Sequence, residues 1–322
     1  MISDPLAPLV DIIIPTHNRA HLIASAIRAA LDQSWWNIKV TVVDDASSDK
    51  TEEVLCPFCS HPRFNYIKLG NNLGTAQAKN VGLLLTDGDA VTFHDSDDLP
   101  HRDKVLHQVR VLTAQDINAD ECLNWGLVGK TAGQALEVGA AFTHHELILP
   151  DGRSVEVRRD LSLFDDVFPN LQMGTQVPGE WTHINSGLFR TEMLRRLGGF
   201  ENCIEEDREF RNRLILNGEI VWVIPQILLT KIETPDSLTQ SATSDYDSAR
   251  RKADRLLVWD KVADWRKNGK VEPVTISIDD FEVSFVSNPA LLGRRDIPVA
   301  PRTNAQVTDI IASASAAELA AQ

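Results

Sequence analysis

Short apolar runs recur at regular intervals in the first hundred residues, and this repetition limits the folds available to the chain. The runs are residues 9–15, 38–43, 64–69 and 91–93. They are rich in β-branched and aromatic residues, as buried strands of parallel sheets are. Helical patterns separate them, so each strand–helix unit is about 25–30 residues long, which suits a crossover between parallel strands. The repetition predicts an α/β protein with a mostly parallel central sheet flanked by helices.

Apolar spacing, capping residues and turn residues predict the other elements. Helices are expected at residues 20–33, 50–55, 76–85 and 100–114, the last entered through Leu99 and Pro100. Strands are expected at 123–128 and 140–149, and a loop at 170–179. Then follow a helix at 191–197 closed by glycines, a helix from 205 to 217, an edge strand at 219–224 and an extended segment at 228–239. A charged helix at 246–267, short strands at 275–278 and 281–286 and a frayed or weakly helical tail complete the chain.

Polar residues stand directly after three of the apolar runs. They are Thr16 after the first, Asp44 and Asp45 after the second, and Asp95, Asp97 and Asp98 after the fourth. Carboxyl ends of parallel strands meet at one edge of a sheet, where ligands bind in such folds. Three acids within four residues are costly to hold together unless something neutralises them. A divalent cation beside a diphosphate would do so, because Mg²⁺ and Mn²⁺ prefer oxygen ligands. The alternative is a solvated acidic turn that caps a helix.

The usual nucleotide-binding loops are missing from the sequence. No Gly-x-Gly-x-x-Gly follows the first strand, and the sequence contains no complete Gly-x-x-x-x-Gly-Lys-Ser/Thr loop. The dinucleotide-binding and P-loop interpretations therefore lose support. Asp44 or Asp45 could still bind a base or a ribose, and the alternative is that they cap the next helix.

The position of Asp207 in the sequence suggests a catalytic role for its carboxylate. On a helix it shares one face with Phe210 and Leu214, so it points toward the protein body. A general base needs such a place, near a site where its pKa can be tuned. The alternative role is stabilisation of the helix dipole, which Glu205 and Glu206 already provide.

Composition and net charge limit the kinds of molecule that the protein is expected to bind. The chain has 322 residues, of which 43% are hydrophobic and 24% charged, and its net charge is −14. This acidity argues against general nucleic-acid binding, which needs a basic face. The sequence has no apolar run long enough to span a membrane and no signal-peptide pattern at its start, so a cytoplasmic location is expected.

Five ordered motifs resemble those of family 2 glycosyltransferases with the Rossmann-like GT-A fold. They are residues 13–20 (IIPTHNRA), 42–49 (VVDDASSD), 72–80 (NLGTAQAKN) and 94–98 (HDSDD), with GGF and ED at 198–200 and 206–207 forming the fifth. The resemblance covers about residues 8–240. It implies inverting, metal-dependent transfer of a sugar from a nucleotide diphosphate donor, a UDP-sugar being favoured, to an acceptor hydroxyl.

The resemblance also implies roles for individual residues. Those expected to contact the donor are Pro15, Thr16, His17, Asn18, Asp44, Asp45, Lys79, Asp95 and Ser96. Asp97 is expected to ligate Mn²⁺ or Mg²⁺ beside the diphosphate, with Asp95 as a second ligand, and Asp207 is the expected general base. Glu233 stands where the family often has a histidine. It is therefore either a substitute oxygen ligand or a lost contact.

The resemblance further suggests a division of the chain. The glycosyltransferase domain is expected at residues 1–240, with a nucleotide-binding half at about 8–115 and an acceptor half at about 116–240. Residues 241–322 are expected to form a C-terminal extension that is helical or irregular.

The sequence leaves the acceptor and two rival functions open. A saccharide or glycoconjugate acceptor in polysaccharide synthesis is expected from family frequency, with peripheral membrane association as an option. The rivals are a sugar nucleotidyltransferase and a catalytically silent protein that binds a sugar or nucleotide. Residues 14–20 contain no glycine for a triphosphate loop, which disfavours the first rival. Retention of Asp97 and Asp207 disfavours the second.

Overall fold

The computed structural model describes residues 7–113, 138–158, 183–217, 219–233 and 247–293. The strand expected at 123–128, the loop expected at 170–179 and the expected frayed tail lie outside these residues.

Strands and helices alternate in the first third of the chain, as predicted. The elements are β1 (Val10–Thr16), α1 (Ile23–Leu31), β2 (Ile38–Asp44), α2 (Thr51–Leu55), η1 (Cys56–Ser60), β3 (Phe64–Leu69), α3 (Thr75–Leu85), β4 (Ala90–Phe93), β5 (Leu99–Pro100) and α4 (Lys104–Thr113). All residues of β1 and β4 are buried. This burial explains why the sequence alternates little between apolar and polar residues there.

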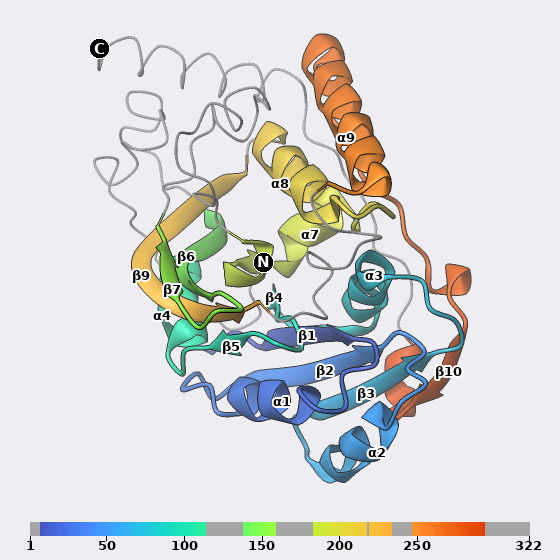
Figure 1. Ribbon diagram of the computed structural model, residues 1–322. Coiled ribbons are helices and arrows are strands. Elements are labelled where there is room, and N and C mark those ends of the chain that lie inside the picture. Colours follow the sequence, from blue (N-terminus) through green and yellow to red (C-terminus); the bar gives the residue numbers. More distant parts are fainter. Residues whose placement is uncertain (1–6, 114–137, 159–182, 218, 234–246, 294–322) are drawn as a thin grey trace.

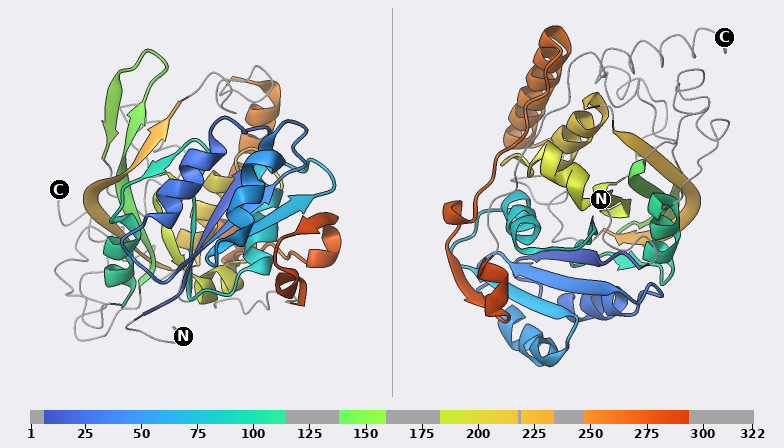
Figure 2. Two further views of the ribbon diagram at one scale, coloured as in Figure 1. Left: turned by 90° about the horizontal axis from the view of Figure 1, so that it is seen from below. Right: turned by 180° about the vertical axis from the view of Figure 1, so that it is seen from behind.

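The remaining described elements mix antiparallel strands with helices. They are β6 (Val138–Ile148), β7 (Ser154–Val157), η3 (Ile184–Ser186), β8 (Leu188–Arg190), α7 (Thr191–Leu197), α8 (Glu206–Leu216), β9 (Ile220–Ile232), α9 (Ala249–Asn268), η4 (Ile278–Asp280), β10 (Val283–Val286) and η5 (Pro289–Gly293). Figure 2 shows β6 and β7 as a hairpin on one side of the molecule, with β10 on the other.

One sheet joins all of the described strands. Its order is β10-β3-β2-β1-β4-β8-β6-β9-β5, with β7 paired to β6. The pairs among β3, β2, β1 and β4 are parallel, which confirms the predicted crossovers. Beyond β4, the pairs of β8 with β4 and with β6 are antiparallel, whereas β6 and β9 run parallel. The α/β prediction is confirmed: the strands from β1 to β4 pair in parallel, and the rest of the sheet mixes antiparallel pairs with the parallel pair of β6 and β9.

Two apolar layers cover the faces of this sheet (Figure 1). On one face, α1 and α4 pack on β1 and β2 through residues such as Ile27, Val105 and Ile12. On the other face, the layer includes α3, α7, α8 and α9, and Ile13 belongs to it. Alternate residues of β1 thus enter opposite layers, because successive side chains of a strand point to opposite faces.

Two predictions near the site are wrong in detail. Leu99 and Pro100 do not open a helix; they form β5 and pair with Thr230 and Leu229, and α4 begins only at Lys104. Proline lacks an N–H, and it fits here because β5 ends the sheet.

The second error concerns the segment around Pro225, where the sequence predicts an edge strand and then a separate extended segment. The expected edge strand at 219–224 continues as β9 to Ile232 and lies between β6 and β5. The pairing register shifts between Ile224 and Ile227, so Pro225 falls at an irregularity where a missing N–H is tolerated.

The residues after 240 join the same sheet. The strand expected at 281–286 is present as β10 and pairs with β3, and the expected charged helix is present as α9. Val258, Val262 and Trp265 of α9 are buried in the layer that also contains Phe210 of α8. Figure 1 shows α8 and α9 side by side.

Candidate functional site

The loops that follow β1 and β2 are joined by hydrogen bonds of side chains that were expected to contact a donor. Asn18 has a positive φ of 51°, and its Oδ1 accepts hydrogen bonds from the N–H groups of Ser48 and Asp49 at 2.8 and 3.2 Å. Nδ1 of His17 lies 2.7 Å from the carbonyl oxygen of Asp45. Both side chains therefore connect the loop after β1 to the loop after β2.

Asp44 and Asp45 also accept hydrogen bonds from other groups of the protein. Asp44 is fully buried and accepts hydrogen bonds from Ser47 N at 2.8 Å and from the Tyr66 hydroxyl at 3.0 Å. The two oxygens of Asp45 accept the N–H groups of Leu73 and Gly74 at 2.7 and 2.8 Å. These bonds fix the loops that follow β2 and β3. Recognition of a base by either acid stays a prediction.

Thr16 and Pro15 end β1 and are buried. The Thr16 hydroxyl has no hydrogen-bond partner among the described residues, although the residue is only 4% exposed. A buried hydroxyl without a partner is unusual, so Thr16 offers a donor or acceptor to a ligand at this edge.

The strongest chemical feature is a group formed by Asp95, Asp98 and His183. One ligand atom from each residue lies within 4.8 Å of those of the other two. Asp98 is fully buried, and its Oδ2 accepts a hydrogen bond from Asn185 at 3.3 Å. Its Oδ1 has no hydrogen-bond partner in the described structure. Burial raises the pKa of Asp98 to about 7. The group therefore has one buried oxygen that accepts no hydrogen bond from the described residues.

Lys231 of β9 contributes an ammonium to the same group. Its Nζ lies 3.4 Å from Asp95 Oδ2, 4.0 Å from Asp98 Oδ1 and 3.4 Å from His183 Nε2. Burial opposes the charge of Asp95, yet the ammonium groups of Lys231 and Lys79 hold the pKa of that carboxyl below its usual range. Burial, followed by the charge of Lys231, lowers the pKa of His183 well below 6.5. His183 is therefore neutral at pH 7, as a metal-ligating imidazole must be.

Lys79 of α3 connects this group to the start of α8. It is 2% exposed, and its Nζ donates to Glu206 Oε1 at 3.1 Å. Burial disfavours its charge, but Glu206, Asp95 and Asp207 together raise the pKa of Lys79. Burial also raises the pKa of Glu206 to about 7. Asp207 is half-buried beside it, and its Oδ1 accepts the N–H of Arg208 at 2.8 Å. The predicted base and the acidic stretch therefore share one cation, Lys79.

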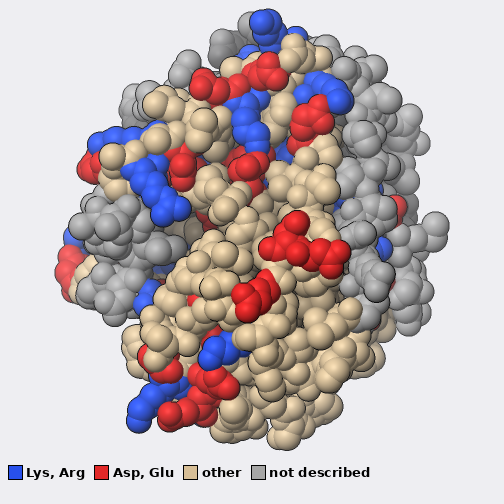
Figure 3. Space-filling model, turned by 90° about the vertical axis from the view of Figure 1, so that its right-hand side faces the viewer, with Lys and Arg blue, Asp and Glu red and all other residues tan. Residues whose placement is uncertain are grey.

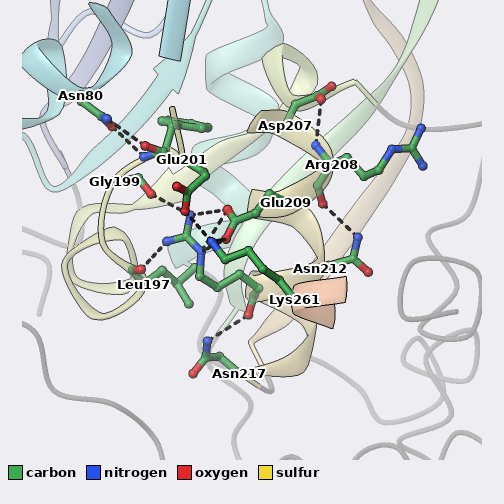
Figure 4. Close-up of polar contacts among 12 residues, drawn as sticks. Asn80, Leu197, Gly199, Glu201, Asp207, Arg208, Glu209, Asn212, Asn217 and Lys261 are labelled. Atoms are coloured by element: carbon green, nitrogen blue, oxygen red, sulfur yellow. Dashed lines mark hydrogen bonds and ion pairs between the residues drawn. The ribbon is translucent and has the colours of Figure 1, made fainter. Parts of the chain in front are cut away.

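A buried ion pair holds α8 in this position. Arg213 and Glu209 are both fully buried and approach to 2.7 Å. The Arg213 guanidinium also donates to the carbonyl oxygens of Leu197 and Gly199. Figure 4 shows Glu209 facing Lys261 and the Leu197–Gly199 segment, with Asp207 at the start of the helix. The pair therefore ties the helix that carries Asp207 to the glycines that precede it.

The predicted glycine cap is confirmed and has a packing role. Gly198 ends α7 with a φ of 81°, a conformation that favours glycine. A Cβ on Gly199 would lie 2.5 Å from Oδ1 of Asn80, the oxygen that accepts the N–H of Phe200 at 2.6 Å. The segment is thereby fixed against α3.

Two predicted metal ligands lie outside the group of three. Asp97 is half-buried, and burial followed by the neighbouring charge of Asp95 raises its pKa. Glu233 follows β9, and its N–H bonds to the carbonyl oxygen of Ile148 at 2.9 Å. Among the described residues, the group close enough to share one ion contains Asp95 but neither Asp97 nor Glu233. Ser96, which lies between Asp95 and Asp97 in the sequence, is buried.

Sequence reasoning missed four members of the site. Asp98 stood in the acidic stretch without an assigned role, and His183 and Asn185 stood in a loop before β8. Lys231 begins the segment in which the resemblance singled out Glu233, but it was assigned no role, because the pairing of β9 with β5 and β6 is what brings it to the acids.

Comparisons with known proteins bear on the family and the fold of the chain. Residues 11–133 match the sequence profile described as "Glycosyl transferase family 2". These residues form a family 2 glycosyltransferase domain.

Curated relatives carry similar names. An uncharacterised glycosyltransferase of Rickettsia typhi is 32% identical over 51% of this chain and 48% of its own length. A Bacillus subtilis protein, TuaG, named as a candidate glycosyltransferase of teichuronic acid biosynthesis, is 34% identical over 33% of this chain and 42% of its own length. The chain thus spans less than half the length of these relatives.

Solved structures share the GT-A fold of the family 2 domain. A mannosyltransferase of Pyrobaculum calidifontis in complex with GDP-Man and Mn²⁺ covers 99% of this chain, with 76% of its own chain aligned, at a TM-score of 0.51 and 20% identity. TarS of S. aureus, in complex with UDP-GlcNAc, covers 71% of this chain, with 60% of its own aligned, at a TM-score of 0.50 and 18% identity.

Surface features add two observations. In the described part of the chain, no helix is long and apolar enough to cross a membrane. On the face drawn in Figure 3, acidic and basic side chains are interspersed, and the described residues form no broad basic patch there.

Proposed function

We propose that this protein is an inverting glycosyltransferase that moves a sugar from a nucleoside diphosphate donor to an acceptor hydroxyl. The observation that carries the proposal is the arrangement around Lys79. This buried ammonium donates to Glu206, the neighbour of Asp207 at the start of α8, at 3.1 Å, and the charges of Asp95 and Asp207 both raise its pKa. A transferase of this kind needs a cationic place for the diphosphate and a base for the acceptor within one site.

Asp207 would act as the general base. Its carboxylate takes the proton of the acceptor hydroxyl while that oxygen attacks the anomeric carbon. The bond between the anomeric carbon and the diphosphate oxygen breaks, and the nucleoside diphosphate leaves with the electron pair. Attack from the face opposite the leaving group inverts the anomeric configuration. Lys79 would stabilise the charge that collects on the diphosphate.

A divalent cation fits the donor atoms of the site. Carboxylate oxygens and a neutral imidazole suit Mn²⁺, and carboxylates also suit Mg²⁺. Asp95, Asp98 and His183 would hold the ion, and the free Oδ1 of Asp98 is an available ligand. The cation supplies positive charge to the leaving diphosphate. Asp97 and Glu233 remain proposed ligands from the sequence.

The donor would lie along the carboxyl ends of β1, β2 and β4. The proposed contacts are Pro15, Thr16, His17, Asn18, Asp44, Asp45, Lys79, Asp95 and Ser96. A UDP-sugar is favoured, and GDP-sugars are the next class to test, since the two structural neighbours were solved with UDP-GlcNAc and GDP-Man. The proposed acceptor is a saccharide or glycoconjugate of a polysaccharide pathway in the cytoplasm, in line with the name of TuaG.

The test is nucleotide release from a panel of UDP- and GDP-sugars, with and without Mn²⁺. One donor should release its nucleotide faster than the others, and Asp207→Asn should slow this release by about 10²–10⁴-fold while the nucleotide still binds. Asp254→Asn, which changes an acid that accepts the N–H of Ile204, is the control and should release nucleotide as the unmodified chain does. Equal release by Asp207→Asn and the unmodified chain would refute the assignment of the base.

A further inference from the structure

The ammonium of Lys231 and a divalent cation would both have to bind the same carboxylate oxygens and imidazole nitrogen. Nζ lies within 4.0 Å of an oxygen or nitrogen of Asp95, Asp98 and His183. A bound Mg²⁺ lies about 2.0–2.1 Å from its ligand atoms, so it would sit among these groups where Nζ now approaches them. Two positive centres at such close range repel one another. The ion and the ammonium therefore cannot share the group in this arrangement.

The fold fixes the approach of Lys231 to these acids. In β9 it is paired with Leu147 of β6, and its neighbour Thr230 is paired with Leu99 of β5. Its backbone is thus bounded by a strand on each side, and only two residues, Asp97 and Asp98, separate Leu99 from Ser96 in the acidic stretch. The lysine comes from the paired part of the sheet, so its Cα is held at a fixed place beside the acids.

Burial of the Asp98 carboxylate favours a cation beside it. Asp98 is fully buried, and Oδ1 has Lys231 as its ion-pair partner at 4.0 Å but no hydrogen-bond partner among the described residues. A buried carboxylate without compensation is costly. In the metal-free chain the ammonium supplies that compensation at a distance longer than a hydrogen bond, which leaves the oxygen available to a better ligand.

We propose that Lys231 is a resident cation that competes with a divalent metal ion for Asp95, Asp98 and His183. The inference deepens the proposed function, since the same groups would face the donor diphosphate. Binding of the metal requires the ammonium to leave its three partners, so the lysine lowers the affinity of the site for the ion. Removing the positive charge, with the length of the side chain kept, should strengthen metal binding.

The experiment measures free Mn²⁺ by electron paramagnetic resonance during titration of the full chain, without nucleotide. Lys231→Met should bind Mn²⁺ about tenfold more tightly than the unmodified chain, or better, because a competing charge is removed. Lys231→Arg keeps the charge and should bind as weakly as the unmodified chain. Lys68→Met removes a lysine that pairs with Glu52 on the surface and is the matched control. Lys231→Gln is a second neutral variant for the case in which Lys231→Met does not fold.

A double variant identifies the ligands. Adding Asp98→Asn to Lys231→Met should abolish the gained affinity. Unchanged or weaker Mn²⁺ binding in both neutral variants, or no binding in any variant, would overturn the inference. These outcomes are separate from failure of the proposed function, which concerns nucleotides: tighter Mn²⁺ binding without binding of UDP or GDP would retain the inference and refute the donor site.

Discussion

At the scale of single residues, the site uses polar and charged side chains for two purposes. Asp44, Asp45 and Asn18 connect loops, whereas Asp98 and Thr16 retain polar atoms without hydrogen-bond partners in the described structure. The sequence showed which residues gather at the edge of the sheet, because strand ends can be recognised from apolar runs. It could not show which of them are already hydrogen-bonded, because that depends on backbone groups from distant loops.

Asp207→Asn tests the residue to which the mechanism assigns proton transfer. The variant should lower turnover by about 10²–10⁴-fold, because an amide cannot accept the proton of the acceptor. Its affinity for the donor nucleotide should stay unchanged. Steady-state rates together with calorimetric titration of the nucleotide separate the two effects. A loss of nucleotide affinity equal to the loss of rate would assign Asp207 to binding instead.

Lys104 gives a pH-dependent prediction. Its Nζ is fully buried and lies 3.0 Å from the Thr92 hydroxyl and 3.2 Å from His94 Nε2. Burial lowers the pKa of Lys104 from 10.5 to about 7. The unfolded chain thus binds more protons than the folded chain between these pH values, so the free energy of unfolding should rise with pH in that window.

The matched variant is Lys104→Met, which has no charge to bury. Relative to it, the unmodified chain should gain free energy of unfolding, of the order of 3 kcal/mol, as the pH rises from 7 to 10. Urea titrations at both pH values measure the difference. A difference that is independent of pH would show that Lys104 keeps its ordinary pKa in the folded chain.

At the scale of elements, α8 is the part whose placement matters most for the proposed chemistry. The sequence predicted the helix and the glycine cap before it, since both follow from local patterns. It did not predict the Glu209–Arg213 pair, because charged residues in a helix normally face water. Here α9 and the 197–199 segment cover them.

Arg213→Met tests this pair. Among the described residues, the variant leaves the buried Glu209 with Lys261, at 3.6 Å, as its ion-pair partner, and it should lower the free energy of unfolding by about 3–5 kcal/mol. The double variant with Glu209→Gln should be less destabilised, because no charge is then left unpaired. Chemical denaturation of the single and double variants measures this. Equal destabilisation in both would assign the cost to the lost bonds of Arg213 with Leu197 and Gly199.

At the scale of the whole molecule, the described part of the C-terminal extension is built into the first domain. The sequence predicted the helix α9 and the strand β10 but gave no sign of their partners. Partners of this kind depend on pairing across more than two hundred residues, as between Val286 and Ile67, and no local pattern encodes it. The other strand expected there, at 275–278, is wrong: Val274 before it makes an isolated bridge with Gly198, and Ile278 begins the 3₁₀ helix η4.

A chain that ends at residue 240 tests this integration. It should lose cooperative unfolding, because the apolar side of α8 and the edge of β3 would be exposed to water. Circular dichroism during heating and size-exclusion chromatography measure folding and association. A monomer that unfolds cooperatively and binds nucleotide as the full chain does would instead make residues 241–322 a separate appendage.

The central claim is that a nucleoside diphosphate binds at the carboxyl edge of β1, β2 and β4, beside Asp95 and Asp98. Calorimetric titration of UDP and of GDP, each with Mn²⁺ and with EDTA, tests it most directly when repeated on Asp95→Asn and Asp98→Asn. The account predicts that one nucleotide binds and that both variants weaken its binding in Mn²⁺. Binding that both variants leave unchanged, or binding of neither nucleotide, would contradict it.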